Sequence, residues 1–294
     1  MQGSLCLNNG VLYVGRCAKT ASVASYDLDG HPLETRFTFR DKETGISSVA
    51  GLDVDDDHRI WVADGASGRL RGFTLFGQEI AIVGAEPGSS EDRRGSIGLP
   101  SDVSASGSDD SLEILIASRG LRRHALQILH PDTGRVRSLR PLGDPRGQFQ
   151  DLVGVAKLGD LVYACERRAR RVEVFRHGDF HFAFQLMASG GGFAVPSAVA
   201  VLDDRRALVA VSQPESALLL VDRTGTLIRV LAWGSGEGAE PRSGEVLQPS
   251  GVVVEAGARD RDTRVAVIDC DGERVQVFNL ESVCYGAFQH LADF

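Results

Sequence analysis

The sequence predicts an all-β fold, a closed six-bladed β-propeller with four antiparallel strands in each blade. Three observations carry this prediction. Apolar stretches of four to six residues alternate with turns rich in Asp and Gly, which is typical of short strands. No long window has helical periodicity. The same order of stretches recurs six times along the 294 residues, and a ring of repeated sheets leaves few bare sheet edges.

The second strand of each unit gives the clearest repeat. Its six copies follow one another at intervals of about 45 to 57 residues, at positions 11–14, 60–63, 114–117, 161–164, 208–211 and 265–268. Dipeptides such as Asp29-Gly30 and Thr224-Gly225 supply the positive φ angles that tight hairpins need. We therefore expect a single domain over residues 1–294, with blades at approximately 3–39, 51–84, 99–142, 148–186, 196–232 and 248–288. No strand is expected to pass from one terminus to the blade of the other, so closure would rest on packing between blades.

The order Pro-x-Gly-hydrophobic, then apolar-Val-Ala-Asp, then Arg-hydrophobic-x-hydrophobic-Phe resembles the NHL repeat. Residues 51–84 and 248–279 match this pattern best, and three of the six units are degenerate. The Asp that follows the second strand is present at Asp64 and Asp269, whereas the other units have Arg16, Ser118, Cys165 and Ser212 there. The repeat's recurrent Arg matches Arg69, Arg171 and Arg274, and the resemblance implies a structural role for them. NHL propellers of larger proteins bind proteins and RNA, which the resemblance extends to this chain as an analogy.

The alternation of strand direction assigns each loop to one of two faces. Loops from strand two to three share a face with the loops that enter the next blade, and this face collects many basic residues. The predicted site for an anionic ligand comprises Arg93, Arg94, Arg119, Arg122, Arg123, His124, Arg146, Arg167, Arg168 and Arg170. The opposite face is expected to be acidic, with residues 55–57, 109–110 and 203–204. Converging arginines favour an anion through bidentate hydrogen bonds, although charged loops can also be merely solvated.

A search for catalytic chemistry gives weaker signals. Six-bladed propellers include metal-dependent lactonases and lyases, and resemblance to these implies ligands around the central channel. Asp102 and Asp151 enter from adjacent blades and together could hold a cation, with capping of loop amides as the alternative role. No histidine recurs at an inner strand and no P-loop, HExxH or GxSxG is present, so we predict no catalytic residues and no cofactor. Cys165 would have a lowered pKa among its arginines if it were exposed, but its place at a strand end predicts partial burial.

Composition limits the partners. The formal net charge of -8 argues against a general nucleic-acid binder, and five cysteines without a CxxC argue against a disulfide framework or zinc site. Apolar runs are too short to cross a bilayer and no signal peptide is visible, so we expect a cytoplasmic location and no membrane partner. Trp233, in the Gly-rich segment before the sixth blade, is either an exposed anchor or a packing residue.

The sequence thus favours a binding or scaffold propeller over an enzyme. Its partner would be a protein segment or another anionic molecule on the Arg-rich face. One alternative is RNA binding by the same face, and another is a metal-dependent hydrolase or lyase with its site in the channel. The oligomeric state is left open.

Overall fold

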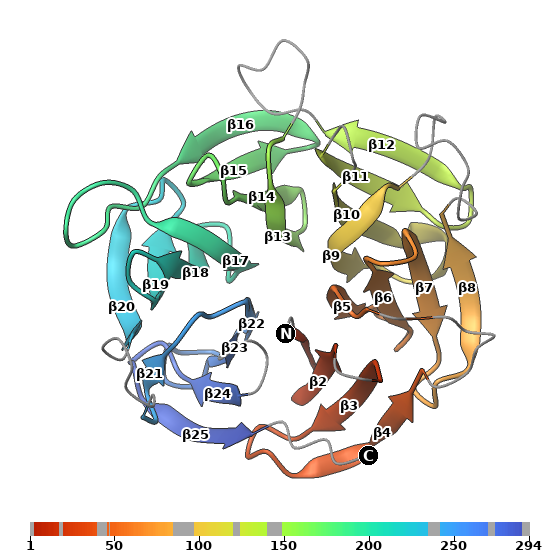
Figure 1. Ribbon diagram of the computed structural model, residues 1–294, viewed down its shortest axis with the longest axis horizontal. Coiled ribbons are helices and arrows are strands. Elements are labelled where there is room, and N and C mark those ends of the chain that lie inside the picture. The colour runs from red at the N-terminus through yellow and green to blue at the C-terminus, as the bar shows by residue number, and fades with distance from the viewer. Residues whose placement is uncertain are drawn as a thin grey trace.

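Six sheets stand around a central axis in the computed structural model, and they follow one another around the ring in chain order (Figure 1). This arrangement confirms the predicted all-β propeller of six blades. The structure describes residues 3–17, 20–39, 46, 48–84, 97–119, 124–139, 149–234, 242–269 and 274–289. Within these residues each sheet consists of one contiguous segment, so no strand is exchanged between the two ends of the chain.

The four main strands of each blade are antiparallel and run outward from the axis in chain order. Blades 1 to 3 comprise β1 (Gly3–Asn8), β2 (Val11–Arg16), β3 (Ser22–Tyr26) and β4 (Pro32–Thr38); β5 (Gly51–Val54), β6 (Ile60–Asp64), β7 (Arg69–Phe73) and β8 (Glu79–Val83); and β9 (Leu99–Ser106), β10 (Glu113–Arg119), β11 (His124–His130) and β12 (Arg135–Leu139). Blades 4 to 6 comprise β13 (Leu152–Leu158), β14 (Leu161–Glu166), β15 (Arg171–Arg176) and β16 (Asp179–Phe184); β17 (Val195–Val201), β18 (Arg206–Gln213), β19 (Ala217–Asp222), β20 (Leu227–Gly234) and β21 (Glu245–Val246); and β22 (Gly251–Glu255), β23 (Arg264–Asp269), β24 (Arg274–Phe278) and β25 (Cys284–Gln289).

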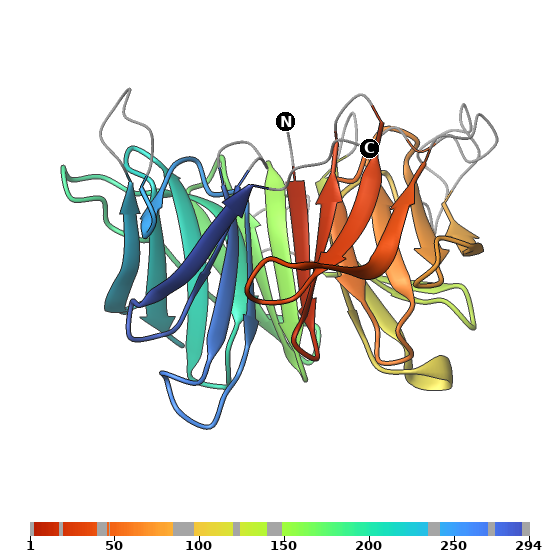
Figure 2. The ribbon, with the colours of Figure 1, turned by 90° about the horizontal axis from the view of Figure 1, so that it is seen from below.

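The strands cross the ring from one face to the other, so the turns of every blade are sorted between two faces (Figure 2). The second strands end and the third strands begin on the upper face of Figure 2, where the first strand of each blade also begins. We name this the entry face, and the other the hairpin face. Among the described residues the only helical piece is a 3-10 turn, η1 (Asp109–Ser111), on the hairpin face, and none of their helices is long or apolar enough to cross a membrane.

The apolar core is divided into clusters, each shared by two neighbouring blades. Successive side chains of a strand point to opposite faces of its sheet, so one strand contributes to the cluster on either side. Between blades 6 and 1, the side chains of Leu12, Val14, Ala266 and Ile268 are buried together. The last blade therefore packs against the first, as expected for closure by blade-to-blade contact.

Hydroxyl groups on the innermost strands bond the blades to one another. Ser101 Oγ in β9 donates to the carbonyl of Leu152 in β13 over 3.1 Å. Ser197 Oγ in β17 donates to the carbonyl of Pro249, just before β22, over 2.6 Å. These bonds fix the positions of adjacent inner strands along the central axis. The turns of neighbouring blades are thereby positioned relative to one another.

Blade 5 departs from the sequence prediction at its outer edge. The strand β20 continues to Gly234, and the short strand β21 pairs with it in parallel, with Trp233 opposite Glu245. Trp233 was expected in a loop after the blade, but it lies in β20 with about half of its surface exposed. The Gly-rich sequence from Gly234 onward predicts a loop, whereas pairing with β21 extends the strand to Gly234.

Candidate functional site on the entry face

The described part of the predicted anion site lies where blades 3 and 4 meet on the entry face. Arg119 is the last residue of β10, and the turn of residues 167–170 joins β14 to β15. Arg167, Arg168 and Arg170 are exposed, whereas Arg119 is half-buried. His124 is the first residue of β11 and pairs with Arg119, but its side chain is not among the described parts. The predicted residues Arg93, Arg94, Arg122, Arg123 and Arg146 lie outside the described residues.

One carboxylate joins the arginines of the two blades. Asp151, directly before β13, accepts a hydrogen bond of 2.7 Å from Arg167 Nε, and its other oxygen lies 3.8 Å from Arg119 Nε. The backbone repeats the link, since the Arg167 amide donates to the Asp151 carbonyl over 2.9 Å. The single negative charge of Asp151 is therefore shared by two guanidinium groups from adjacent blades, which leaves a positive excess at this junction.

Arg119 is half-buried, which is unfavourable for its positive charge. Burial lowers the pKa of its guanidinium, Asp151 opposes this shift, and the charge of Arg167 adds to it. Its Nη2 atom is buried and has no hydrogen-bond partner among the described residues. A guanidinium nitrogen that is removed from water without an acceptor is costly, so an anionic group placed there would be stabilised.

The neighbouring turn offers further donors. Arg168 makes no hydrogen bond or ion pair with any described residue. Arg170 has a φ of 53° and donates from Nη1 to the carbonyl of Phe193 over 3.3 Å, which leaves its charge without a described carboxylate. The structure thus joins Arg119 and Arg167 through Asp151. Arg168 and Arg170 lie in the same turn as Arg167, and the side chain of Arg170 reaches the connection that leads to blade 5. Their chemistry suits carboxylate or phosphate groups.

The acids expected on the hairpin face are partly paired with arginines. Asp55 is fully buried. Its carboxylate is compensated by hydrogen bonds from Arg59 Nε over 2.7 Å and from Trp61 Nε1 over 2.9 Å. Asp203 pairs with Arg206 at 2.9 Å, and the same guanidinium reaches Asp260 at 2.8 Å. Arg59 is also 2.9 Å from Asp57 and 3.7 Å from Asp109, so one arginine is shared by three acids and the pairs of this face leave an excess of negative charge.

The recurrent acid and arginine of the repeat form a hydrogen-bonded pair in blades 4 and 6. In blade 4 the acid lies one residue later than the sequence predicts. Arg274 binds Asp269 at 2.7 Å, and the equivalent pair in blade 4 is Arg171 with Glu166 at 2.9 Å. The sequence alignment placed Cys165 opposite this arginine. Strand β14 pairs its last residue, Glu166, with Arg171, so the acid lies one position later. Cys165 is fully buried and burial raises its pKa, which removes the reason for expecting a reactive thiol.

The central channel is the second candidate region. It has a volume of about 270 Å³ and is lined by the six innermost strands, with Asp53, Asp102 and Lys157 among its charged residues. Asp102 accepts hydrogen bonds from the amides of Val103 and Val155, at 2.9 and 2.8 Å. Burial raises the pKa of Asp102 to about 7, in spite of these bonds. Burial also raises the pKa of Asp53.

The structure assigns Asp102 and Asp151 different partners. Asp102 joins its strand to the next blade through the amide of Val155, and Asp151 holds the arginines described above. Asp151 is not among the residues that line the channel. Amide capping, the alternative role considered for the pair, accounts for Asp102.

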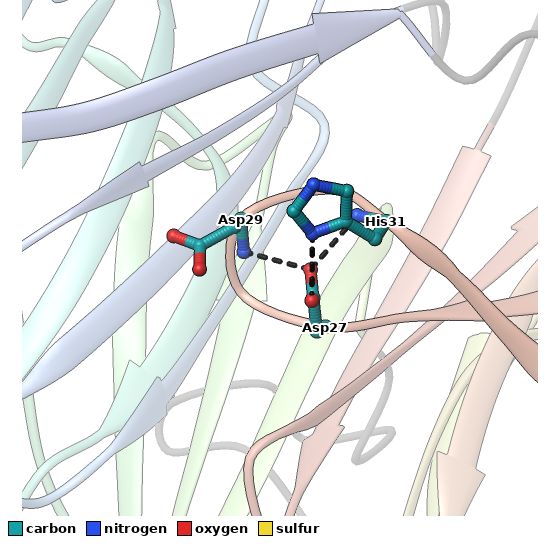
Figure 3. Close-up of side chains that lie close together, drawn as sticks. All are labelled: Asp27, Asp29 and His31. Carbon is teal, nitrogen blue, oxygen red and sulfur yellow. Dashed lines mark hydrogen bonds and ion pairs between the residues drawn. The ribbon is translucent and has the colours of Figure 1, made fainter.

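Asp27, Asp29 and His31 form the one group in the described residues with three metal-ligating side chains close together. Asp27 accepts hydrogen bonds from the amides of Asp29 and His31 and from His31 Nδ1, and Asp29 joins these bonds through its amide (Figure 3). The same two amide bonds, from the residues two and four positions later, recur at Asp222 and Asn279 in other blades. The group is therefore a hairpin turn that this repeat uses several times.

Comparisons with known proteins agree on the fold. No family model and no curated protein sequence matches the chain. A virginiamycin B lyase from Staphylococcus aureus superposes with a TM-score of 0.60 at 10% identity, covering 97% of this chain and 83% of that one. The WD40 β-propeller domain of Doa1 gives 0.57 at 13% identity, with 97% and 81% covered. A gluconolactonase from Xanthomonas campestris gives 0.57 at 14% identity, with 95% and 83% covered.

These neighbours include two enzymes and a WD40 domain, so the shared architecture is that of a β-propeller and does not select a function. Membership of the NHL family stays a prediction from the repeat pattern.

Proposed function

We propose that this propeller is a binding module that recognises an acidic segment of a partner protein on the entry face of blades 3 and 4. The observation that carries the proposal is the excess of guanidinium groups at one junction. Arg119 and Arg167 share the single carboxylate of Asp151, and Arg168 beside them has no described partner. Carboxylates of a partner would supply the missing acceptors through charge-assisted hydrogen bonds.

A protein segment suits the whole molecule better than RNA does. The formal net charge of -8 repels a polyanion at long range, whereas a short acidic segment needs only the local excess of positive charge. The excess of acids over arginines in the described pairs of the hairpin face would repel an anionic ligand from that face. RNA remains the competing ligand in the test below.

The test compares two fluorescein-labelled probes of equal charge, a C-terminally amidated peptide of eight residues that alternates Glu with Gly and a single-stranded RNA pentamer without a terminal phosphate. We expect the peptide to bind more tightly than the RNA, with an affinity that falls as salt is raised. In an Arg168→Glu/Arg170→Glu variant, binding should weaken at least about tenfold, because two attractive charges become repulsive. Equal binding by this variant would overturn the proposal, and preference for the RNA would replace it with the RNA-binding alternative.

The matched control carries the same change of charge on the other face. Arg205 and Arg223 are exposed residues of blade 5 on the hairpin face. An Arg205→Glu/Arg223→Glu variant should bind the peptide as the unaltered protein does. A similar loss in both variants would mean that net charge, and not the entry face, determines binding.

The channel supports a second candidate, a hydrolase or lyase site. The observation in its favour is the raised pKa of Asp102, about 7, because perturbed carboxyl groups in a cavity are common at active sites. This function requires a bound divalent ion in the channel. Metal analysis of the purified protein that finds less than one ion in about ten molecules, after incubation with Ca²⁺ or Mg²⁺, would remove it.

A further inference from the structure

An apolar groove lies at the rim between blades 4 and 5. Its volume is about 210 Å³, and its walls come from the connection between β16 and β17, the turn between β18 and β19, and the strands β19 and β20. The lining includes Met187, Pro214, Leu219, Leu227, Val230 and Trp233. The connection from β16 to β17 projects outward beside β20, and so forms one wall at the edge of the ring (Figure 1).

The side chains of this groove are more exposed than large apolar residues normally are. Met187, Leu227 and Trp233 have 67%, 51% and 53% of their surface exposed. In the sheet, Leu227 and Trp233 pair with Val221 and Ala217, which belong to the cluster that blade 5 shares with blade 4, so the groove is the exposed outer rim of that cluster. Clustered exposed apolar residues are typical of contact surfaces, and an aromatic anchor beside a flexible Met suits the recognition of apolar side chains.

The groove is continuous with the arginine turn of blade 4. Arg170 Nη1 donates to the carbonyl of Phe193, a residue of the connection that forms the groove wall. Gln185 Nε2, at the start of the same connection, donates to the carbonyl of Ala169 in that turn. The basic turn and the apolar groove therefore share a wall, so a single ligand can reach both.

The charges around the groove set the direction of such a ligand. Arg168 and Arg170 lie at one side without a described carboxylate partner. Glu215 lines the groove and binds the hydroxyl of Ser189 in the opposite wall. An acidic group of the ligand is therefore favoured on the side of the arginines and disfavoured beside Glu215.

We propose that this groove takes an apolar side chain of the acidic partner segment, while Arg168 and Arg170 bind the carboxylates next to it. The inference rests on the proposed function and specifies its ligand as a peptide with acidic residues beside an apolar anchor. The volume fits this class, because it is below the 300–1,000 Å³ (approximately) of sites that enclose whole small molecules. One or two side chains would fill it.

The experiment begins with an unbiased selection. A random peptide library displayed on phage is selected against the full chain, and enriched peptides are synthesised and titrated. Trp233 reports the contact directly, because the other tryptophan, Trp61, is only 2% exposed and bonded to Asp55. We expect enriched sequences to combine acidic residues with Leu, Met or an aromatic residue. Their binding should protect Trp233 from quenching by acrylamide.

Two double variants separate the groove from the arginines. Met187→Gln/Leu227→Gln removes apolar surface without adding charge and should weaken binding of the selected peptides at least about tenfold. The matched control is Ile80→Gln/Ile82→Gln, which changes two exposed residues of the outer strand β8 in blade 2, 45% and 52% exposed. This control should bind as the unaltered protein does.

The outcomes distinguish the inference from the proposed function. Loss of binding in both the groove variant and the Arg168→Glu/Arg170→Glu variant supports the inference. Loss in the arginine variant alone overturns the groove and leaves the proposed function standing. Equal binding by both variants overturns the two together, as does enrichment of basic peptides. Protection of Trp233 that rises with protein concentration in the absence of peptide would assign the groove to a second copy of the chain and overturn the inference.

Discussion

Glu166 and Glu173 lie in neighbouring strands with a single guanidinium, that of Arg171, between their carboxylates. Arg171 Nη2 is 2.9 Å from Glu166 and 2.5 Å from Glu173. Both glutamates are fully buried. Burial raises the pKa of Glu173 to about 7, Arg171 opposes this, and the charge of Glu166 adds to it. In blade 6 the position that matches Glu173 holds Gln276, which needs no proton to coexist with Asp269.

This pair predicts a pH-dependent stability. The Glu173 carboxyl titrates near 4.5 when unfolded and near 7 when folded, so the folded state binds more protons between these values. The free energy of unfolding should therefore fall as pH rises from 4.5 to 7. Glu173→Gln should abolish this contribution and be more stable than the unaltered protein at pH 8, by on the order of 2 kcal/mol. Urea unfolding of both proteins at pH 4.5 and pH 8 measures the difference. Equal stabilities of the two proteins at pH 8 would contradict the raised pKa of Glu173.

Asp102 is predicted to act as a clasp between blades 3 and 4. In Asp102→Ala the amide of Val155 loses its acceptor, which should cost on the order of 1–3 kcal/mol of stability. The measurement is chemical unfolding at pH 5.5, where most of the carboxyl is protonated and its charge contributes little. Asp110, exposed on the hairpin face, provides the control, and Asp110→Ala should change stability by less than about 0.5 kcal/mol. An equally small effect of both substitutions would contradict the role of Asp102 in joining blades 3 and 4.

Asp151 limits the positive charge of the entry face. Asp151→Asn keeps the shape of the side chain but frees Arg119 and Arg167 from their shared anion. We expect the acidic peptide to bind about fivefold more tightly at low salt, with a steeper loss of affinity as salt is added. Titrations at two salt concentrations test this. Weaker binding in Asp151→Asn would show that the carboxylate orders the site instead of neutralising it.

The thiol of Cys165 should be inert in the folded protein. It is fully buried and burial raises its pKa, so little reactive thiolate forms. Iodoacetamide treatment followed by peptide mass spectrometry should leave Cys165 unmodified until denaturant is added. Half-buried Cys17 serves as the internal comparison. Rapid labelling of Cys165 under native conditions would contradict its position in the core.

The repeat pattern was sufficient to predict the fold because each blade uses the same sequence of strand and turn signals. It was also sufficient to place Arg119 and Arg167 on one face, since that follows from the alternation of strand direction alone. It could not give the partners of these arginines. The bond from Arg167 to Asp151 depends on how the strands pack, and the spacing of the two residues in the sequence does not predict it.

The groove around Trp233 was missed for a related reason. Its walls come from separate segments of blades 4 and 5, and the spacing of residues along the chain does not show that these segments meet at the rim. The acid of blade 4 was misplaced because the apolar stretches were aligned by their first residues. The acid precedes the arginine by five residues in blades 2, 4 and 6, and this spacing selects Glu166 instead of Cys165. A comparison of blades could have found Glu173, because its position holds Gln276 in blade 6.

The proposed partner would cover the entry face of blades 3 and 4 and reach the groove between blades 4 and 5. Hydrogen–deuterium exchange of the full chain, with and without a selected peptide, measures which residues it covers. We expect slower exchange in the turn of residues 167–170, in residues 187–193 and in β20. Slower exchange confined to the hairpin-face turns around Asp55, Asp109 and Asp203 would contradict this proposal.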